Sequence, residues 1–270
     1  MKKQMDQADG LRRLFRTAPP EVMAVLPCGA VTTRWVALQA QARARAGRQV
    51  LALDERQACG NLADCLGVSP RFDLLQAVTG QIGEAQCVQD VMPGLQLAQV
   101  GQLVRELGAE RVTNQRTVNL LQSLQAGCDE WLLLAQPGEM EGLSPLVLAA
   151  PRLTLVVDAH PQSVTAAWAS LARLVREAPE MSFVLCHAGE HDARARATLD
   201  RFCQLAAQRL GRRVEQAGSL GEALLLRHGM GELTTRYFLQ RILQTCRPPA
   251  VKPFEARFPG TPAHVRMSLP

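Results

Sequence analysis

Aromatic residues are scarce in this 270-residue chain, where Phe, Trp and Tyr together make up 4% of the sequence. Proteins that bind single-stranded nucleic acid stack the bases on aromatic side chains, so the composition argues against that class. The sequence also lacks an apolar run close to the about 18 residues that a membrane span needs, and no apolar signal stretch follows the first residues, Met-Lys-Lys-Gln. We therefore expect a cytoplasmic protein.

The cysteines form no recognisable metal or redox motif. None of the eight belongs to a C-x-x-C pair, and no group of Cys and His has the spacing of a zinc site. Most of them lie beside Leu, Val or Ala, as small core residues do, and this usage fits a reducing compartment. His187 and His191 are four residues apart, but Gly189 lies between them and a third ligand is missing. No metal site is expected.

The charge of the chain is neither strong nor concentrated. The formal net charge is +5, and the arginines are scattered rather than gathered in blocks. This distribution is typical of a solvated surface and gives no strong signal for nucleic-acid binding, although a basic patch on the folded protein is an alternative. The chain has 270 residues, of which 47% are hydrophobic, and this is enough to bury one large core.

Short apolar segments alternate with amphipathic ones along most of the chain. Strands are expected at 22–26, 50–53, 95–100, 130–134, 153–157 and 181–185. Helices are expected at 33–46, 116–124, 163–177 and 192–210, with Trp35 and Trp168 in the core. The alternation predicts an α/β fold with a single doubly wound, mostly parallel sheet, because right-handed βαβ crossovers place successive strands in parallel.

The first residues predict a separate amphipathic helix. Between residues 4 and 16 apolar side chains recur at helical spacing on one face, and the breaker Thr17-Ala18-Pro19-Pro20 follows. This helix either packs on the domain or offers its apolar stripe to a partner. The expected parts of the chain are a helix and linker at 1–20, an α/β domain at 21–246 and an irregular Pro-rich tail at 247–270.

The turn after the first predicted strand is where a phosphate-binding loop would lie. The run Leu26-Pro27-Cys28-Gly29-Ala30-Val31-Thr32-Thr33 joins that strand to a helix. Ligands of open parallel sheets bind at the carboxyl ends of strands, and helix N-termini favour phosphate. A working loop also needs glycines that let the backbone wrap phosphate, a lysine that balances its charge, and a Ser or Thr that holds magnesium.

This arrangement resembles the MinD/ParA class of P-loop proteins, whose loop reads Lys-Gly-Gly-Val-Gly-Lys-Thr and whose second strand ends in Asp-x-Asp. The run from Gly47 to Asp54 is similar to the end of the first helix and the second strand of that class. Counted back from Gly47 without a gap, Thr33 falls on the loop Thr and Gly29 on a loop Gly. The remnants of a nucleotide site that the resemblance implies are Gly29, Thr32, Thr33 and Asp54.

Several catalytic positions depart from the class. Pro27 and Thr32 stand in place of the two loop lysines, and Arg56 replaces the second, water-orienting Asp. The segment 132–137 runs from leucines into Ala-Gln-Pro, where relatives have Asp-Thr-Gly. Because phosphoryl transfer depends on positioned cations and metal ligands, we expect no ATP hydrolysis and no required cofactor. The alternative is weak binding of ATP and magnesium, or slow hydrolysis, by an aberrant loop.

The predicted N-terminal helix resembles that of one branch of this class, the FlhG/FleN regulators of flagellar number. The run from residue 5 to 14 is similar to the Asp-Gln-Ala-x-x-Leu-Arg helix of that branch, which docks on the flagellar SRP-type GTPase FlhF and stimulates GTP hydrolysis. The resemblance implies that Gln7 reaches the catalytic centre of the partner. It also implies apolar contacts by Ala8 and Leu11 and polar contacts by Asp6 and Arg12.

The resemblance covers nearly the whole chain and implies a regulator of flagellar number or placement that does not hydrolyse ATP. A flagellar transcription activator and switch-complex proteins are further expected partners. Relatives end in an amphipathic membrane-targeting helix, which is not evident at 264–270, so membrane cycling is not expected. A DNA-partition or polysaccharide-secretion protein of the same fold is a third alternative, which salt-dependent DNA binding would favour.

Overall fold

The computed structural model describes residues 19–29, 31–109, 112–136, 143–189, 192–225 and 234–245. The strands are β1 (Glu21–Pro27), β2 (Val50–Asp54), β3 (Val88–Met92), β4 (Leu95–Gln99), β5 (Glu130–Leu134), β6 (Arg152–Val157), β7 (Ser182–His187) and β8 (Val214–Ala217). The helices are α2 (Thr32–Arg45), α3 (Leu62–Leu66), α4 (Leu74–Val78), α5 (Glu84–Cys87), α6 (Gly101–Gly108), α7 (Asn114–Ser123), α8 (Pro145–Ala149), α9 (Pro161–Glu177), α10 (Ala193–Leu210), α11 (Leu220–Leu225) and α12 (Thr235–Thr245).

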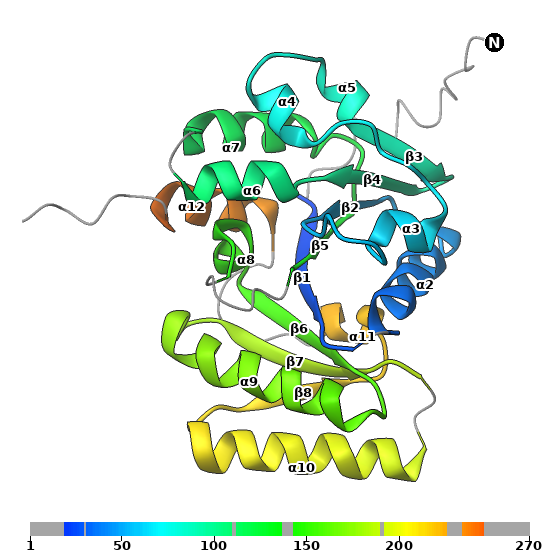
Figure 1. Cartoon of the computed structure of the whole chain (residues 1–270), viewed down its shortest axis with the longest axis vertical. Helices are drawn as coiled ribbons and strands as arrows, with labels where there is room; N and C mark the ends of the chain where they lie inside the picture. Colours follow the sequence, from blue (N-terminus) through cyan, green and yellow to red (C-terminus); the bar gives the residue numbers. More distant parts are fainter. Residues whose placement is uncertain are drawn as a thin grey trace, which may run out of the picture.

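The strands form one eight-stranded sheet in the order β3-β4-β2-β5-β1-β6-β7-β8 (Figure 1). Every strand pairing in this sheet is parallel except that of β3 with β4. A two-residue turn ending in Gly94, whose φ is +85°, joins these two strands and permits the antiparallel hairpin. The predicted α/β class with a single, mostly parallel sheet is confirmed.

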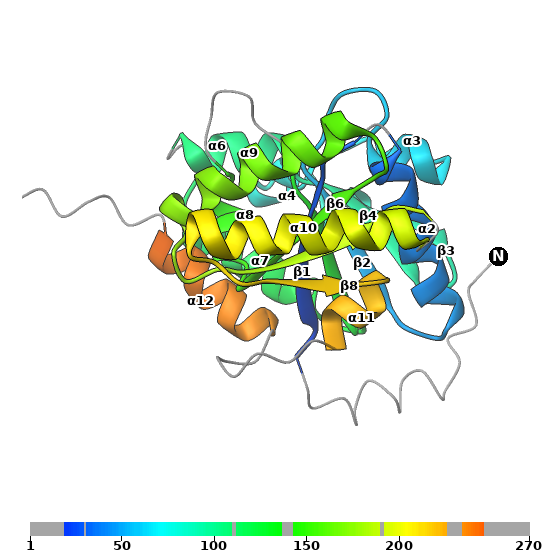
Figure 2. The same cartoon turned by 90° about the horizontal axis from the view of Figure 1, so that it is seen from below.

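Helices cover both faces of the sheet (Figures 1 and 2). On one face the core contains side chains from α4, α6, α7, α8, α9, α10 and α12. On the other face a smaller core contains side chains from α2, α3 and α11. This covering on both faces explains why the central strands read as continuous apolar runs, because every residue of β2, β5 and β6 is buried.

Several element predictions are corrected by the structure. Strands β3 and β8 were not predicted, because neither forms a continuous apolar run: β3 has no fully buried residue and only the two ends of β8 are buried. The helix expected to begin at residue 116 begins at Asn114, since Thr113 caps it and accepts a hydrogen bond from the Arg116 N–H. Trp35 and Trp168 are half-buried and pack at the edges of the two cores.

The predictions on membrane spans and on the division of the chain have different outcomes. None of the described helices is long and apolar enough to cross a lipid bilayer. Residues 1–18 and 246–270 lie outside the described residues, and with them the predicted N-terminal helix and the Pro-rich tail predicted at 247–270. The predicted division of the chain therefore stays a prediction.

Candidate functional site

The candidate site lies at the edge of the sheet where the parallel strands have their carboxyl ends. Strand β1 is paired with β5 on one side and with β6 on the other. The chain continues from β1 to β2 on the first side and reaches β6, β7 and β8 on the second, so the strand order reverses at β1. Ligands of doubly wound sheets bind at such a reversal, which here is occupied by the turn between β1 and α2.

The turn after β1 is closed by its own side chain. The Thr32 hydroxyl accepts a hydrogen bond from the Gly29 N–H at 3.1 Å and donates one to the Gly29 carbonyl at 2.6 Å. Thr32 is completely buried, so its hydroxyl points into the turn rather than toward solvent. The N–H group of Gly29, which a phosphate loop would offer to a ligand, already has a partner.

A buried carboxylate lies directly against Gly29. A Cβ atom placed on Gly29 would overlap Asp158 Oδ2 and would lie 2.9 Å from Ser163 Oγ. The Asp158 side chain is fixed there, because its Oδ1 accepts a hydrogen bond from the His160 N–H at 2.9 Å, and the Asp158 N–H donates to Ser163 Oγ at 3.0 Å. A carboxylate in this position repels phosphate from the turn.

Arginine enters the site from the loop after β2. The Arg56 guanidinium donates a hydrogen bond to Thr33 Oγ1, the hydroxyl that the resemblance assigned to magnesium. Asp54 accepts hydrogen bonds from the N–H groups of Arg56 at 3.0 Å and Leu62 at 2.8 Å. Burial raises the pKa of Asp54 to about 6, and these hydrogen bonds lower it only in part. Thr33 and Asp54, which the resemblance assigned to a nucleotide site, are therefore both hydrogen-bonded within the protein.

Glu55 is a site residue that sequence reasoning missed. Its buried carboxylate accepts hydrogen bonds from the Gln136 N–H at 3.2 Å and from the Ser144 hydroxyl. Ser144 in turn caps α8, accepting from the Val147 N–H at 3.0 Å. Burial raises the pKa of Glu55 to about 7. Its position immediately after Asp54 was a signal, but the partners lie more than 80 residues away along the chain.

The site offers neither a nucleophilic thiol nor a metal cluster. Burial raises the pKa of the Cys28 thiol to about 12, and the thiol donates to the Leu26 carbonyl at 3.4 Å. In the described part of the chain, no group of three or more His, Cys, Asp or Glu residues is arranged to hold a metal ion. His187 ends β7 and is buried, whereas His191 lies outside the described residues.

Lysine is missing from the α/β body whichever alignment is chosen. No lysine occurs between Lys3 and Lys252, so the whole body lacks the residue that balances phosphate charge in a P-loop. Among the described residues, Arg56 brings a cation to this site, where its guanidinium donates a hydrogen bond to Thr33 Oγ1. The residues present do not fit ATP with magnesium, because the turn is closed, Asp158 lies against it and the loop lysine is missing.

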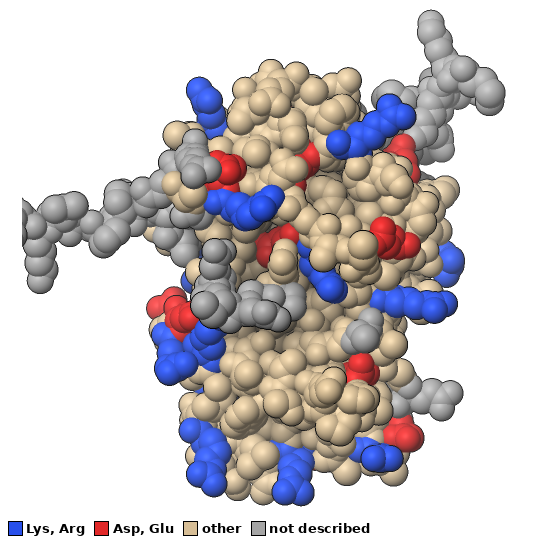
Figure 3. Space-filling model, in the orientation of Figure 1, with Lys and Arg blue, Asp and Glu red and all other residues tan. Residues whose placement is uncertain are grey.

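The surface shows no concentrated basic region on the face drawn in Figure 3. Basic side chains are separated there by wide areas of uncharged surface and by acidic side chains. A protein that follows a nucleic-acid backbone needs a continuous basic stripe or patch. This face gives no support to the alternative of DNA binding.

No protein-family model matches the sequence, and no curated protein matches it. Solved structures do match. A plasmid partition protein from Borrelia burgdorferi is 12% identical, with a TM-score of 0.50 over 84% of this chain and 97% of that one. An ATP complex of a McdA variant from Cyanothece is 13% identical, with a TM-score of 0.51 over 84% and 88%. The cell division protein MinD from Aquifex aeolicus is 14% identical, with a TM-score of 0.50 over 83% and 95%.

These neighbours define the class of fold. The chain has the α/β fold of the MinD/ParA proteins. Identities of 12–14% show the fold and do not by themselves assign an activity.

The sequence-predicted site residues fall into two groups. The structure brings Gly29, Thr32, Thr33 and Asp54 to one edge of the sheet, where the first two bond to each other and the last two are connected through Arg56. The expected partner-binding residues lie outside the described residues, so their roles stay predictions: Asp6, Gln7, Ala8, Leu11 and Arg12.

Proposed function

We propose that this chain is a nucleotide-independent regulator with a MinD-like body, which controls flagellar number or placement from the cytoplasm. The N-terminal helix is its effector segment and acts on the flagellar SRP-type GTPase. The α/β body serves as the scaffold that presents this helix. A flagellar transcription activator or switch-complex protein is a second partner of the same body.

The observation that carries the proposal is the closed turn after β1. Thr32 occupies the Gly29 N–H, Asp158 places a negative charge against the turn, and the body contains no lysine. A fold that keeps the MinD/ParA architecture without its phosphate chemistry is suited to a binding role. The resemblance of residues 5–14 to an activator helix supplies the partner in this proposal.

The test is GTP hydrolysis by the flagellar SRP-type GTPase of the same organism, with and without the full-length protein. We expect stimulation by the wild type and loss of that stimulation in Gln7→Ala. Gln4→Ala, which changes the same residue type three residues earlier in the sequence, is the matched control and retains stimulation. Absence of stimulation by the wild type, or equal stimulation by Gln7→Ala, contradicts the proposed role of the helix.

A second candidate function is weak nucleotide binding through an unusual loop. The observation that favours it is Arg56, which brings a cation to the Thr33 hydroxyl at the place of the phosphate loop. In that case Arg56 substitutes for the loop lysine, and Arg56→Ala abolishes the binding of magnesium-ATP. Under the nucleotide-independent proposal neither the wild type nor this variant binds magnesium-ATP.

A further inference from the structure

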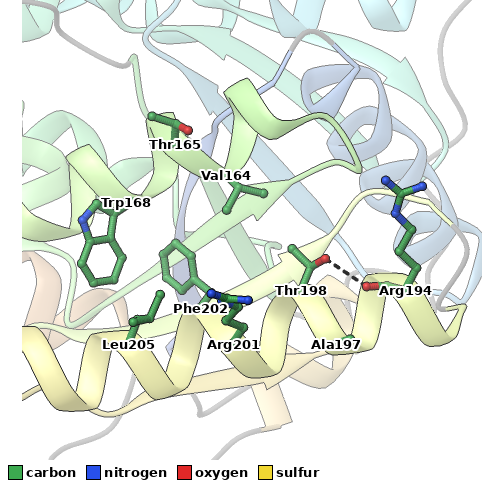
Figure 4. Close-up of a pocket in the computed structure, with 9 residues that line it drawn as sticks. All are labelled: Val164, Thr165, Trp168, Arg194, Ala197, Thr198, Arg201, Phe202 and Leu205. Carbon is green, nitrogen blue, oxygen red and sulfur yellow. Dashed lines mark hydrogen bonds between the residues drawn. The ribbon is translucent and has the colours of Figure 1, made fainter.

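A groove between α9 and α10 lies outside the candidate site (Figure 4). It has a volume of about 600 Å³. The two helices contribute both apolar and basic side chains to its lining. The residues that line it are Val164, Thr165 and Trp168 from α9, and Arg194, Ala197, Thr198, Arg201, Phe202 and Leu205 from α10.

We propose that this groove binds an amphipathic helix of a partner protein whose polar side carries carboxylates. The proposal is independent of the N-terminal effector helix, because it concerns a different surface of the body. The groove is then a docking site on the α/β body itself, in addition to the N-terminal helix.

The floor of the groove is apolar. Trp168 and Phe202 meet edge to face, with ring centroids 5.6 Å apart and an interplanar angle of 82°. Phe202 is buried, while Leu205 leaves 36% of its surface exposed one turn further along α10. Aromatic and aliphatic side chains arranged along two adjacent helices form the kind of surface on which an amphipathic helix lays its apolar face.

The rim of the groove is positively charged. Arg194 and Arg201 are both exposed and lie seven residues apart on α10, which places them on the same face about 10.5 Å apart along the axis. Among the described residues, neither forms a salt bridge with an acidic side chain. The spacing matches two carboxylates placed two turns apart on a partner helix, and Arg favours carboxylates because its planar fork bonds both oxygens.

Charge also argues against the ends of this chain as the occupant. Residues 1–18 contain five basic and two acidic side chains, and residues 246–270 contain four basic and one acidic. Both segments therefore carry the same sign as the rim and are repelled by it. A partner helix with Asp or Glu opposite the two arginines has the opposite sign.

The experiment measures binding of a fluorescein-labelled amphipathic peptide of about 15 residues, long enough to form a helix on the groove. Its apolar face carries Leu, and two Glu stand seven residues apart on its polar edge. A second peptide has Lys at those two positions. The proteins are the full-length wild type, the double variant Arg194→Glu/Arg201→Glu and the control Arg209→Glu, which changes an exposed arginine of α10 outside the groove. Circular dichroism verifies that the variants are folded.

We expect the wild type and Arg209→Glu to bind the Glu peptide equally, with Kd weakened about tenfold in the double variant, as two lost rim ion pairs imply. The Lys peptide binds more weakly than the Glu peptide. No binding of the Glu peptide at millimolar concentration overturns the proposal, and so does equal binding by the double variant. Binding of phosphatidylglycerol vesicles that the double variant loses, without peptide binding, overturns it in favour of an anionic membrane surface.

Discussion

At Gly29 the space that a side chain would need is filled by the carboxylate of Asp158, which directly follows the neighbouring strand β6. This contact distinguishes the turn from one that is open to phosphate. In a phosphate loop, glycine lets the backbone approach a ligand, whereas here it lets the backbone approach Asp158 and Ser163. The same residue type therefore serves the packing of the protein rather than the binding of a nucleotide.

Gly29→Ala tests this packing. The added methyl group would overlap Asp158 Oδ2, so Asp158 or the turn must move. We expect the free energy of unfolding to fall by about 1–3 kcal/mol, the usual cost of overpacking, as measured by urea denaturation. Gly83→Ala is the control for added volume, because the nearest atom to its added Cβ is 3.9 Å away, and it should cost at most about 1 kcal/mol, since Gly83 is the N-cap of α5 and Ala is less favourable there. Equal effects of the two substitutions would show that Asp158 does not press on the turn.

Glu55 predicts a pH dependence of stability. Burial raises its carboxyl pKa from 4.5 to about 7, so the folded state retains a proton that the unfolded state has released. This group therefore lowers stability as pH rises from about 4.5 to about 7. Glu55→Gln cannot ionise, and its stability relative to the wild type should increase by roughly 2–3 kcal/mol between about pH 5 and pH 7.5.

The measurement is urea denaturation of both proteins at several pH values in that range. Gln at this position keeps an amide oxygen that can accept from the Gln136 N–H, so the comparison isolates the ionisation. A constant difference in stability across the range would mean that Glu55 ionises in the folded protein as readily as in the unfolded chain.

At the scale of elements, α2 is joined to β5 by an ion-pair group at the end of the sheet opposite the candidate site. Glu130 begins β5, is buried, and pairs with Arg43 of α2 and with Arg48 of the following turn. Glu130→Ala leaves both guanidinium groups without this partner. We expect a loss of about 2–3 kcal/mol in the free energy of unfolding, less than for a fully buried pair because Arg48 is 42% exposed.

The matched control for this ion pair is Glu177→Ala. Glu177 pairs with Arg173 one turn away on α9, with a separation of 3.6 Å, and the two side chains are 36% and 27% exposed. Pairs at this helical spacing contribute about 0.3–0.5 kcal/mol, so thermal denaturation should separate the two variants clearly. A loss as small in Glu130→Ala as in Glu177→Ala would contradict the view that Glu130 fixes α2 against the sheet.

The elements that the sequence predicted are those whose burial leaves a simple pattern. β2, β5 and β6 are buried on both faces and therefore read as apolar runs, and α9 and α10 are long enough to show helical periodicity. Strands β3 and β8 lie at the two edges of the sheet, where partial exposure removes that pattern. Edge strands are recognised by their pairing, which is a tertiary property.

The sequence predicted where the candidate site lies, but only some of the residues and contacts that form it. The strand, turn and helix around Gly29 indicated the position of the loop, and the residue types indicated the loss of its chemistry. Neither the contact of Asp158 with Gly29 nor that of Glu55 with Ser144 leaves a local signal, since both join segments far apart in the sequence. Such contacts follow from how the strands are ordered in the sheet.

At the scale of the whole molecule, the fold is that of the MinD/ParA proteins, but the candidate site does not fit ATP with magnesium. Its mostly parallel sheet lies between two helical layers, and solved structures of MinD/ParA proteins share this fold. The turn after β1 lies at the carboxyl edge of the sheet. In this chain that edge is filled by contacts among its own side chains. We therefore propose that the body is a scaffold, with binding surfaces at the N-terminal helix and along the α9–α10 groove.

Thermal unfolding with and without millimolar magnesium-ATP tests this scaffold role most directly. A ligand that binds only the folded state at about 100 times its Kd stabilises it by about 2.7 kcal/mol, which raises the Tm of a domain of this size by several degrees. We predict that magnesium-ATP changes Tm by less than about 1 °C, as little as magnesium with AMP does. A rise of several degrees that requires both ATP and magnesium, and that Arg56→Ala abolishes, would contradict the scaffold role and establish a working nucleotide site.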